Sequence, residues 1–269
     1  MNNENVRNLL GEILGTFIMV FIGVGAVATA TLFGAHTGPF QVGMAWGLAV
    51  AIAIYMTRSL SDAHFNTAVS FAMLVTGNMD IKKFCIYTVG QFIGAIIAGL
   101  LLYLLFAPAV AGAAANGMTA AAASIWCEVY PNAALAADGG KVAYQLSPLI
   151  AACAEGVGIG LLVMVIMGVT DAKNNGAPNS NIFPLFIGLM LTIIICTIGP
   201  LTDAGLNPAR DLGPRIAAFI CGIPGAHIDA MDIVVYTVGP LVGAGVFAWI
   251  YKGIFGKAHA AAYDANKAE

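Results

Sequence analysis

Long apolar stretches alternate with short polar stretches along this chain of 269 residues. Six of the apolar stretches approach or exceed the length of about 20 helical residues that a bilayer requires. They cover residues 9–33, 40–60, 84–106, 147–169, 182–200 and 233–255. This pattern predicts an all-α membrane protein with six transmembrane helices.

Two further apolar segments, 66–77 and 207–220, are too short to cross a bilayer. The second carries Arg210 and Asp211, whose charges would be costly in contact with lipid. Asn207 suits a helix N-cap, and Pro208 suits the first helical position, where a missing N–H costs nothing. We therefore expect two re-entrant half-helices that enter the membrane and stop inside it.

The two halves of the chain share three pairs of landmarks at similar spacing. These are Ser61–Val69 with Thr202–Arg210, Glu12/Gly15 with Glu155/Gly158, and Gly90/Gly94 with Gly239/Gly243. The glycine pairs are spaced for close helix approach. The recurrence predicts a first repeat at 1–106 and a second at 147–255, each with three spans and one half-helix. Because three spans end on the opposite side from their start, the repeats are inverted and their half-helices meet near the midplane.

The segment between the repeats, 107–146, is rich in Ala and Gly and is expected to be a long external connecting loop. The segment 256–269 is expected to be a cytoplasmic tail. With both termini inside, the positive-inside rule is satisfied, because Lys141, Arg210 and Arg215 are the only basic residues placed outside. We therefore expect a multi-pass protein of the cell membrane.

The composition supports a membrane protein and excludes a soluble one. Hydrophobic residues make up 59% of the chain and charged residues 9%, whereas soluble domains are about a quarter charged. The net charge of −3 gives no indication of nucleic-acid binding. The five cysteines lack metal-ligand spacing, so we expect neither a metal nor a cofactor.

Two Asn-x-Ala half-helices within two three-helix repeats are a specific combination. On these residues, and over about 9–255, the chain resembles the major intrinsic protein family of aquaporins and glycerol facilitators. The resemblance implies a passive channel for glycerol, other polyols and water that excludes protons and ions. It also implies no catalytic step, a bilayer environment, and a homotetramer in which each protomer has its own pore.

Asn66 and Asn207 are the strongest candidate site residues. Each side-chain carbonyl can cap its half-helix, while the NH₂ group is free to point toward a permeant hydroxyl or water at the midplane. Each helix N-terminus carries about half a positive charge. Exclusion of cations by such ends, together with an arginine, is a known arrangement in aquaporin-type pores.

By resemblance, Trp46, Ile195, Ala204 and Arg210 form the outer selectivity constriction. Arg210 donates hydrogen bonds to permeant oxygens, and Trp46 forms an aromatic wall. Ordinary packing remains the alternative for Ile195 and Ala204, and a structural ion pair, for instance with Asp211, remains the alternative for Arg210.

Glu12 and Glu155 are carboxylates inside predicted spans, which by default indicate a functional site or a specific partner. By resemblance they accept hydrogen bonds from the re-entrant loops and support them. The alternative is a proton-coupled secondary transporter of a small metabolite, in which these glutamates carry protons. A structural membrane protein with a closed pore is a further alternative.

Several residues depart from the family pattern. Thr67 replaces the usual proline of the first half-helix, and Asp62 and Asp203 replace glycines. Restoring proline at Thr67 should be tolerated, because the first helical N–H has no intrahelical partner. Glycerol facilitators combine Trp and Arg with Gly and Phe where this chain has Ile195 and Ala204. A channel mainly for water, urea or lactic acid therefore remains an alternative.

Overall fold

The computed structural model describes residues 3–132 and 145–268, and these residues form helices and loops without a strand. The helices that carry the fold are α1 Glu4–Phe33, α2 Pro39–Thr57, α3 Thr67–Val75, α4 Ile81–Ala115, α5 Thr119–Ser124, α7 Pro148–Thr170, α8 Phe183–Thr202, α9 Pro208–Ile220, α10 Ala230–Ile233, η1 Val234–Val238, α11 Gly239–Ile250, η2 Tyr251–Phe255 and α12 Gly256–Ala268. Here η1 and η2 are π-helical turns.

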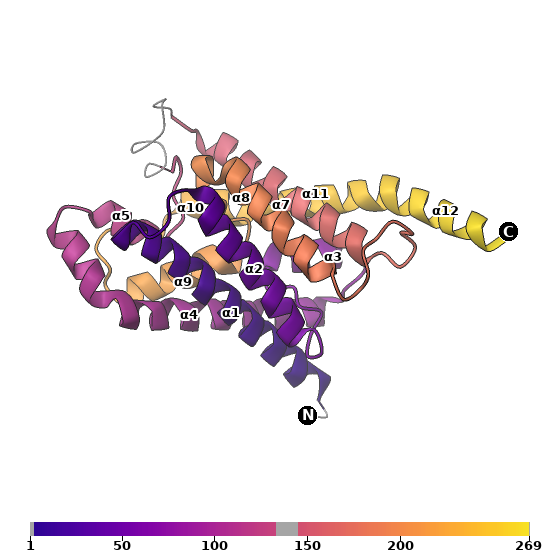
Figure 1. Cartoon of the computed structure of the whole chain (residues 1–269), viewed down its shortest axis with the longest axis horizontal. Helices are drawn as coiled ribbons and strands as arrows, with labels where there is room; N and C mark the ends of the chain where they lie inside the picture. The colour runs from indigo at the N-terminus through magenta and orange to yellow at the C-terminus, as the bar shows by residue number, and fades with distance from the viewer. Residues whose placement is uncertain (1–2, 133–144, 269) are drawn as a thin grey trace.

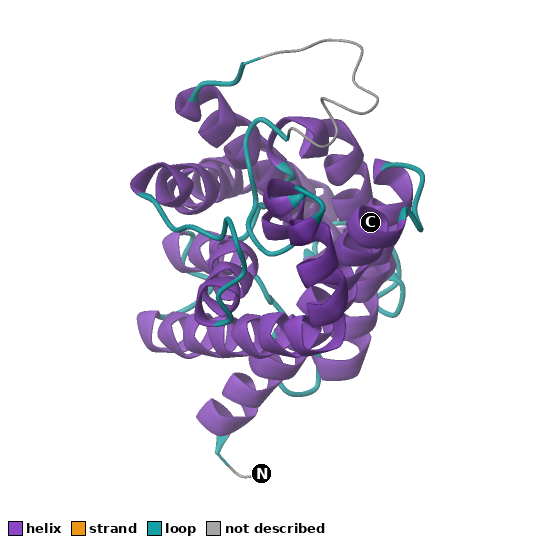
Figure 2. Ribbon diagram, turned by 90° about the vertical axis from the view of Figure 1, so that its left-hand side faces the viewer, coloured by secondary structure: helices purple, strands orange, loops and turns teal. Residues whose placement is uncertain are grey.

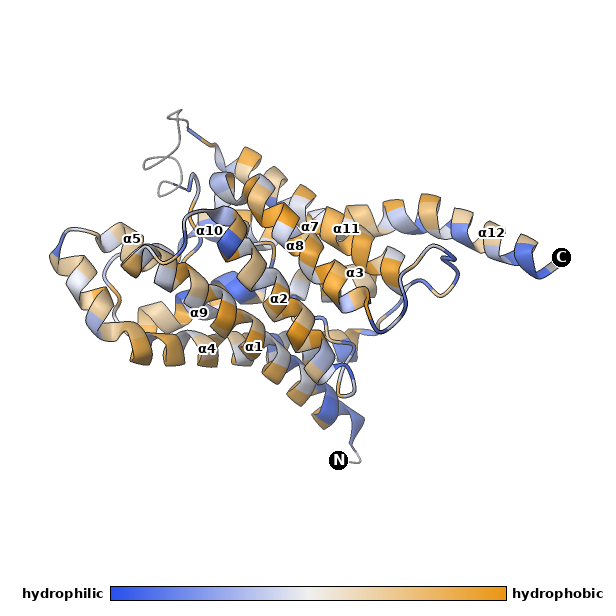
Figure 3. Ribbon diagram, viewed as in Figure 1, coloured by the Kyte–Doolittle hydropathy of each residue, from blue (hydrophilic) through white to orange (hydrophobic). Residues whose placement is uncertain are grey.

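Six helices of the described chain are long and apolar enough to cross a membrane. Five are single elements, and the sixth is the continuous run Ala230–Lys267 from α10 into α12. Figure 3 shows apolar residues along the middle of the long helices and polar residues at the N-terminus and along α12. The expected all-α membrane fold with six spans is confirmed.

The structure extends two of the expected spans. The third helix does not end at Phe106 but continues through Pro108 to Ala115, so the first part of the expected loop 107–146 is helical. The segment 256–269, expected only as a polar tail, is helical to Ala268. Residues 133–144 of the connection lie outside the described residues.

Close glycine contacts join equivalent helices within each repeat. A Cβ atom on Gly94 of α4 would lie 2.3 Å from the Ile13 carbonyl oxygen of α1. In the second repeat, a Cβ atom on Gly243 of α11 would lie 2.0 Å from the Gly156 carbonyl oxygen of α7. Helix backbones therefore touch at these positions, as small residues at membrane helix interfaces allow.

Helices α2 and α8 join the two repeats. A Cβ atom on Gly47 would lie 2.3 Å from the Gly188 carbonyl oxygen, and the Thr192 hydroxyl donates to the Gly43 carbonyl oxygen at 2.9 Å. Half-helix α3 packs against α4, α7 and α11, and half-helix α9 packs against α4; Figure 2 shows the helices of the bundle in the view turned by 90°. Both chain ends lie on the opposite side of the bundle from α5 (Figure 1).

Candidate functional site

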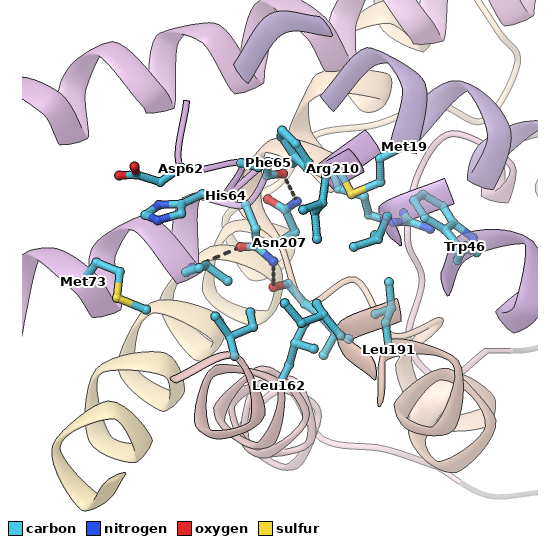
Figure 4. Close-up of a pocket in the computed structure, with 18 of the residues that line it drawn as sticks. Met19, Trp46, Asp62, His64, Phe65, Met73, Leu162, Leu191, Asn207 and Arg210 are labelled. Carbon is cyan, nitrogen blue, oxygen red and sulfur yellow. Dashed lines mark hydrogen bonds between the residues drawn. The ribbon is translucent and has the colours of Figure 1, made fainter. Parts of the chain in front are cut away.

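A pocket of about 470 Å³ lies between the two half-helices and the long helices α2, α7 and α8. Figure 4 shows Trp46 and Arg210 toward one end of the pocket and Asp62 and His64 toward the other. The loops that precede α3 and α9 line one side. Leu162 and Leu191 lie across the pocket from these loops (Figure 4), and α7 and α8 also contribute the apolar side chains of Ile166, Ile187 and Ile195 to the lining.

The N-termini of α3 and α9 meet in the pocket through their N-cap asparagines. The Asn66 carbonyl accepts from the Ala68 N–H at 2.8 Å, and the Asn207 carbonyl accepts from the Ala209 N–H at 3.1 Å. These bonds satisfy backbone donors that an α-helix leaves free at its start.

Each asparagine amide also reaches across to the opposite repeat. Asn66 Nδ2 donates to the Leu206 carbonyl oxygen at 3.1 Å, and Asn207 Nδ2 donates to the Phe65 carbonyl oxygen at 2.8 Å. An amide nitrogen carries two hydrogens, so each side chain keeps a second donor beyond this crossed bond. Both asparagines line the pocket, where a solute oxygen could accept from that donor.

The loops before the half-helices adopt left-handed backbone conformations at non-glycine residues. The φ angles are +58° at Ala63 and +50° at Phe65, and +59° at Ala204 and +57° at Leu206. Such conformations are costly for residues with a Cβ and persist only where the surroundings fix them. The two repeats thus share one strained loop geometry.

Two buried glutamates fix these loops. Glu12 accepts from the backbone N–H groups of His64 at 3.1 Å and Phe65 at 2.8 Å. Glu155 accepts from the N–H of Gly205 at 3.0 Å and from the N–H of Leu206. Neither glutamate is among the residues that line the pocket, so each carboxylate lies behind its loop.

Trp46, Ile195, Ala204 and Arg210 all line the pocket, and each is less than a tenth exposed. The Arg210 guanidinium carbon lies 4.4 Å from the centroid of the Trp46 ring, a favourable position for a cation–π contact. Trp46 of the first repeat and Arg210 of the second, far apart in the sequence, are therefore in contact at one end of the pocket.

The charged partners of this region differ from those considered from the sequence. Arg210 forms its ion pair with Glu128, from the connection between the repeats, and not with Asp211. Asp211 instead accepts two hydrogen bonds from Arg215, at 3.2 Å from Nε and 2.8 Å from Nη2. Asp203 accepts from the Val129 N–H at 3.3 Å and also from Asn132.

Glu128 is the residue of this region that sequence reasoning missed. It lies in an Ala-rich segment whose conformation no pattern fixes, and Arg210 is far away along the chain. The useful signal was its charge, because a carboxylate close to a membrane helix bundle requires a partner.

Among the described residues, one acidic group with histidine could hold a cation: His227, Asp229 and Asp232, whose ligand atoms lie within 4.8 Å of one another. The Arg215 guanidinium already forms an ion pair with Asp232, with Nη1 2.9 Å from Oδ2. The hydrogen bond from the Asp232 N–H lowers the pKa of the Asp229 carboxyl. These groups are arranged around an arginine and a helix cap, which accounts for the cluster.

Comparisons with known proteins agree with this geometry. The family model of the major intrinsic proteins matches residues 1–251. The glycerol uptake facilitator of Haemophilus influenzae is 33% identical over 267 residues, covering 95% of this chain and 96% of that protein. The propanediol uptake facilitator of Citrobacter freundii is 33% identical, covering 96% and 95%. The X-ray structure of the aquaglyceroporin from Plasmodium falciparum superimposes with a TM-score of 0.81 at 29% identity, covering 95% of this chain and 98% of that one. The chain belongs to the major intrinsic protein family.

Proposed function

We propose that this protein is a passive membrane channel for glycerol, other small neutral solutes and water, and that it excludes protons and ions. The observation that carries the proposal is the meeting of two half-helix N-termini, capped by Asn66 and Asn207, in a pocket with one polar and one apolar side. Similar proteins are named glycerol and propanediol uptake facilitators.

The two-sided lining matches the chemistry of a polyol. Along the polar side, the asparagine amides and Arg210 supply donors for hydroxyl oxygens. Leu162 and Leu191 face the loops across the pocket and suit the carbon side of the solute (Figure 4). The partial positive charges of the two helix ends oppose the passage of cations and protons.

In this proposal Trp46, Ile195, Ala204 and Arg210 form the selectivity constriction, and Glu12 and Glu155 support the loops. The proton-coupled transporter is the less favoured alternative, because neither glutamate lines the pocket. Their backbone donors, such as the Phe65 N–H at 2.8 Å from Glu12, give each carboxylate a structural task.

The test is stopped-flow light scattering of proteoliposomes in a glycerol gradient, with and without an imposed pH gradient. A channel gives a glycerol flux that follows the solute gradient alone. A rate that responds to the pH gradient, or uphill accumulation, would favour the transporter. Vesicles without protein and vesicles with Asn207→Leu, which removes the cap and the pocket donor together, are the controls.

The proposed location is the cell membrane, with both termini in the cytoplasm and four copies in the assembly. The N-terminus and α12 lie on the same side of the bundle, opposite α5 (Figure 1). The residue Lys141, expected outside, lies beyond the described residues. Labelling of single cysteines introduced at the termini tests the orientation, and light scattering of the purified protein tests the tetramer.

A further inference from the structure

The segment 125–132 lies over the outer part of α9 and is held there through its backbone. The Glu128 N–H donates to Asp211 Oδ1 at 3.1 Å, and Arg215 Nη2 donates to the Glu128 carbonyl oxygen at 2.7 Å. The neighbouring Val129 N–H donates to Asp203 at 3.3 Å. The main chain of Glu128 is therefore fixed from both sides by groups of the second repeat.

The side chain of Glu128 is directed at the constriction. It is 2% exposed and forms an ion pair with Arg210, whose side chain is 7% exposed. The Arg210 guanidinium carbon also lies 4.4 Å from the centroid of the Trp46 ring. Arg210 thus contacts both a carboxylate and an aromatic ring.

This arrangement changes the charge of the constriction. Arg210 alone would place a full positive charge in a narrow region shielded from bulk water, where such a charge acts strongly. The paired carboxylate cancels it. The second carboxylate oxygen of Glu128 is buried without a hydrogen-bond partner among the described residues, so charge pairing with Arg210 is the main interaction of this side chain.

We propose that Glu128 is a specificity-determining residue of this channel: as the counter-ion of Arg210, it makes the outer constriction electrically neutral. Arg210 keeps its donors for solute oxygens, but ion exclusion depends on the two half-helix ends and on a constriction that carries no net charge. The residue acts through Arg210 and is not among the pocket-lining residues, so it positions and neutralises without contacting the solute. The proposal rests on the proposed channel function.

The pair predicts an unusual response to the loss of Arg210. Its removal leaves Glu128 as a buried, unpaired carboxylate beside the solute path, which destabilises the fold and attracts cations. Removal of both charges restores a neutral constriction. A cation leak after the loss of Arg210 should therefore require Glu128.

The experiment is a double-mutant cycle with Glu128→Gln, Arg210→Met and the double variant in the full-length protein. We measure the melting temperature in detergent, and potassium and glycerol fluxes in proteoliposomes. Arg210→Met should lower the melting temperature by about 10 °C and raise the potassium leak at least about tenfold. The double variant should recover at least half of the lost melting temperature and return the leak to within about twofold of wild type.

Asp229→Asn is the matched control. It also removes an acidic charge on the outer side, but Asp229 is exposed and lies in the outer loop, and asparagine keeps its capping role. Combined with Arg210→Met, it should rescue neither the melting temperature nor the leak.

The outcomes separate this inference from the proposed function. An Arg210→Met variant that cannot be purified, while the double variant can, counts as the same rescue. The role of Glu128 would be overturned if the effects of the two substitutions were additive. It would also be overturned if the Arg210→Met variant and the double variant both failed to fold. Wild-type vesicles without glycerol flux would overturn the channel function, whatever the melting temperatures show.

Discussion

The half-helices α3 and α9 hold the same backbone geometry with different side chains. Both begin at an asparagine cap, both follow a loop with left-handed residues, and both loops are held by a buried glutamate. One turn into each helix, the first repeat has Val69 and the second has Arg210.

The first repeat surrounds its half-helix with a buried polar network. Thr67 Oγ1 donates to Gln91 Oε1 at 2.9 Å, and Gln91 Nε2 donates to Glu12 at 2.8 Å and to Ser70 at 3.0 Å. His64 Nδ1 lies 3.0 Å from the Ser70 hydroxyl. Every member of this network comes from the first repeat.

The second repeat has charges at the corresponding place. Arg215 is fully buried and is bound by Asp211, Asp232 and the carbonyl oxygens of Glu128 and His227. Several of these partners come from the connection and from the turn before α10. The charged half-helix therefore takes partners from the connection and from the turn before α10, whereas the polar network around α3 takes its members from the helices and loop of the first repeat.

This difference assigns separate tasks to the two repeats. The shared frame of asparagine caps and buried glutamates builds the middle of the pocket. In the proposed channel the added charges lie at the outer end, where we expect the solute to be selected, and the connection between the repeats supplies the carboxylate that pairs with Arg210. The outer end should therefore be both the most specific and the most easily disrupted part of the molecule.

The largest expected effect is at Arg215. Arg215→Ala leaves Asp211 and Asp232 without their cation, and breaking a buried pair costs about 3–5 kcal/mol. The corresponding residue of the first repeat is Leu74, which is partly buried. Leu74→Ala removes only apolar contact and should cost about 1–2 kcal/mol, below the range for fully buried leucines. Thermal unfolding of both purified variants tests which substitution costs more stability. Equal losses would contradict the interpretation that Arg215 stabilises the buried carboxylates around α9.

The next effect concerns two glycines in equivalent positions. A Cβ atom on Gly15 would lie 1.9 Å from the buried Phe65 ring, whereas one on Gly158 would meet the flexible ends of Ile198 and Leu206 at 2.6 and 2.7 Å. Overpacking costs about 1–3 kcal/mol, so Gly15→Ala should lie near the upper limit and Gly158→Ala near the lower. Gly25→Ala, with its nearest neighbour at 3.4 Å, is the control and should leave the melting temperature nearly unchanged.

The sequence was sufficient to predict the fold because the apolar stretches and each copy of the duplicated motif can be recognised within short stretches of the chain. Six spans, two half-helices and the asparagine caps all followed from patterns within short windows. The partner of Arg210 did not follow, because Glu128 reaches it through a segment without periodicity. The extension of α4 through Pro108 was also missed, since a proline normally ends a helix.

Thr67 shows the same limit at a single residue. From the sequence, proline should be tolerated there, but the Thr67 N–H donates to Asn207 Oδ1 at 3.3 Å and the hydroxyl donates to Gln91. Thr67→Pro removes both bonds, each worth about 0.5–1.5 kcal/mol. On the structure we expect a loss of about 1–3 kcal/mol in thermal unfolding. Pro208→Thr in the second repeat breaks no hydrogen bond and is the control; a Thr67→Pro variant as stable as Pro208→Thr would show that the two bonds contribute little.

The smallest effect on stability, and the most specific effect on transport, is expected at the constriction. By the resemblance, Ile195 stands where glycerol facilitators have glycine, and Ala204 stands where they have phenylalanine. Both line the same pocket as Trp46 and Arg210. In the proposed constriction we therefore expect an opening displaced toward Ala204, with a looser fit to the carbon backbone of glycerol and more room for planar or branched solutes.

The variant Ile195→Gly with Ala204→Phe should move the opening back. We expect the ratio of glycerol flux to urea and lactic acid flux to rise about three- to tenfold, because one or two apolar contacts are worth about 1 kcal/mol in discrimination. Each single substitution should do less, since Ile195→Gly alone enlarges the opening and Ala204→Phe alone obstructs it. The two sites share one cavity, so their effects should not add.

Stopped-flow measurements with the three solutes give the ratios directly. Ratios that stay constant in all three variants would remove Ile195 and Ala204 from the constriction, and Trp46 and Arg210 would then have to select the solute without them.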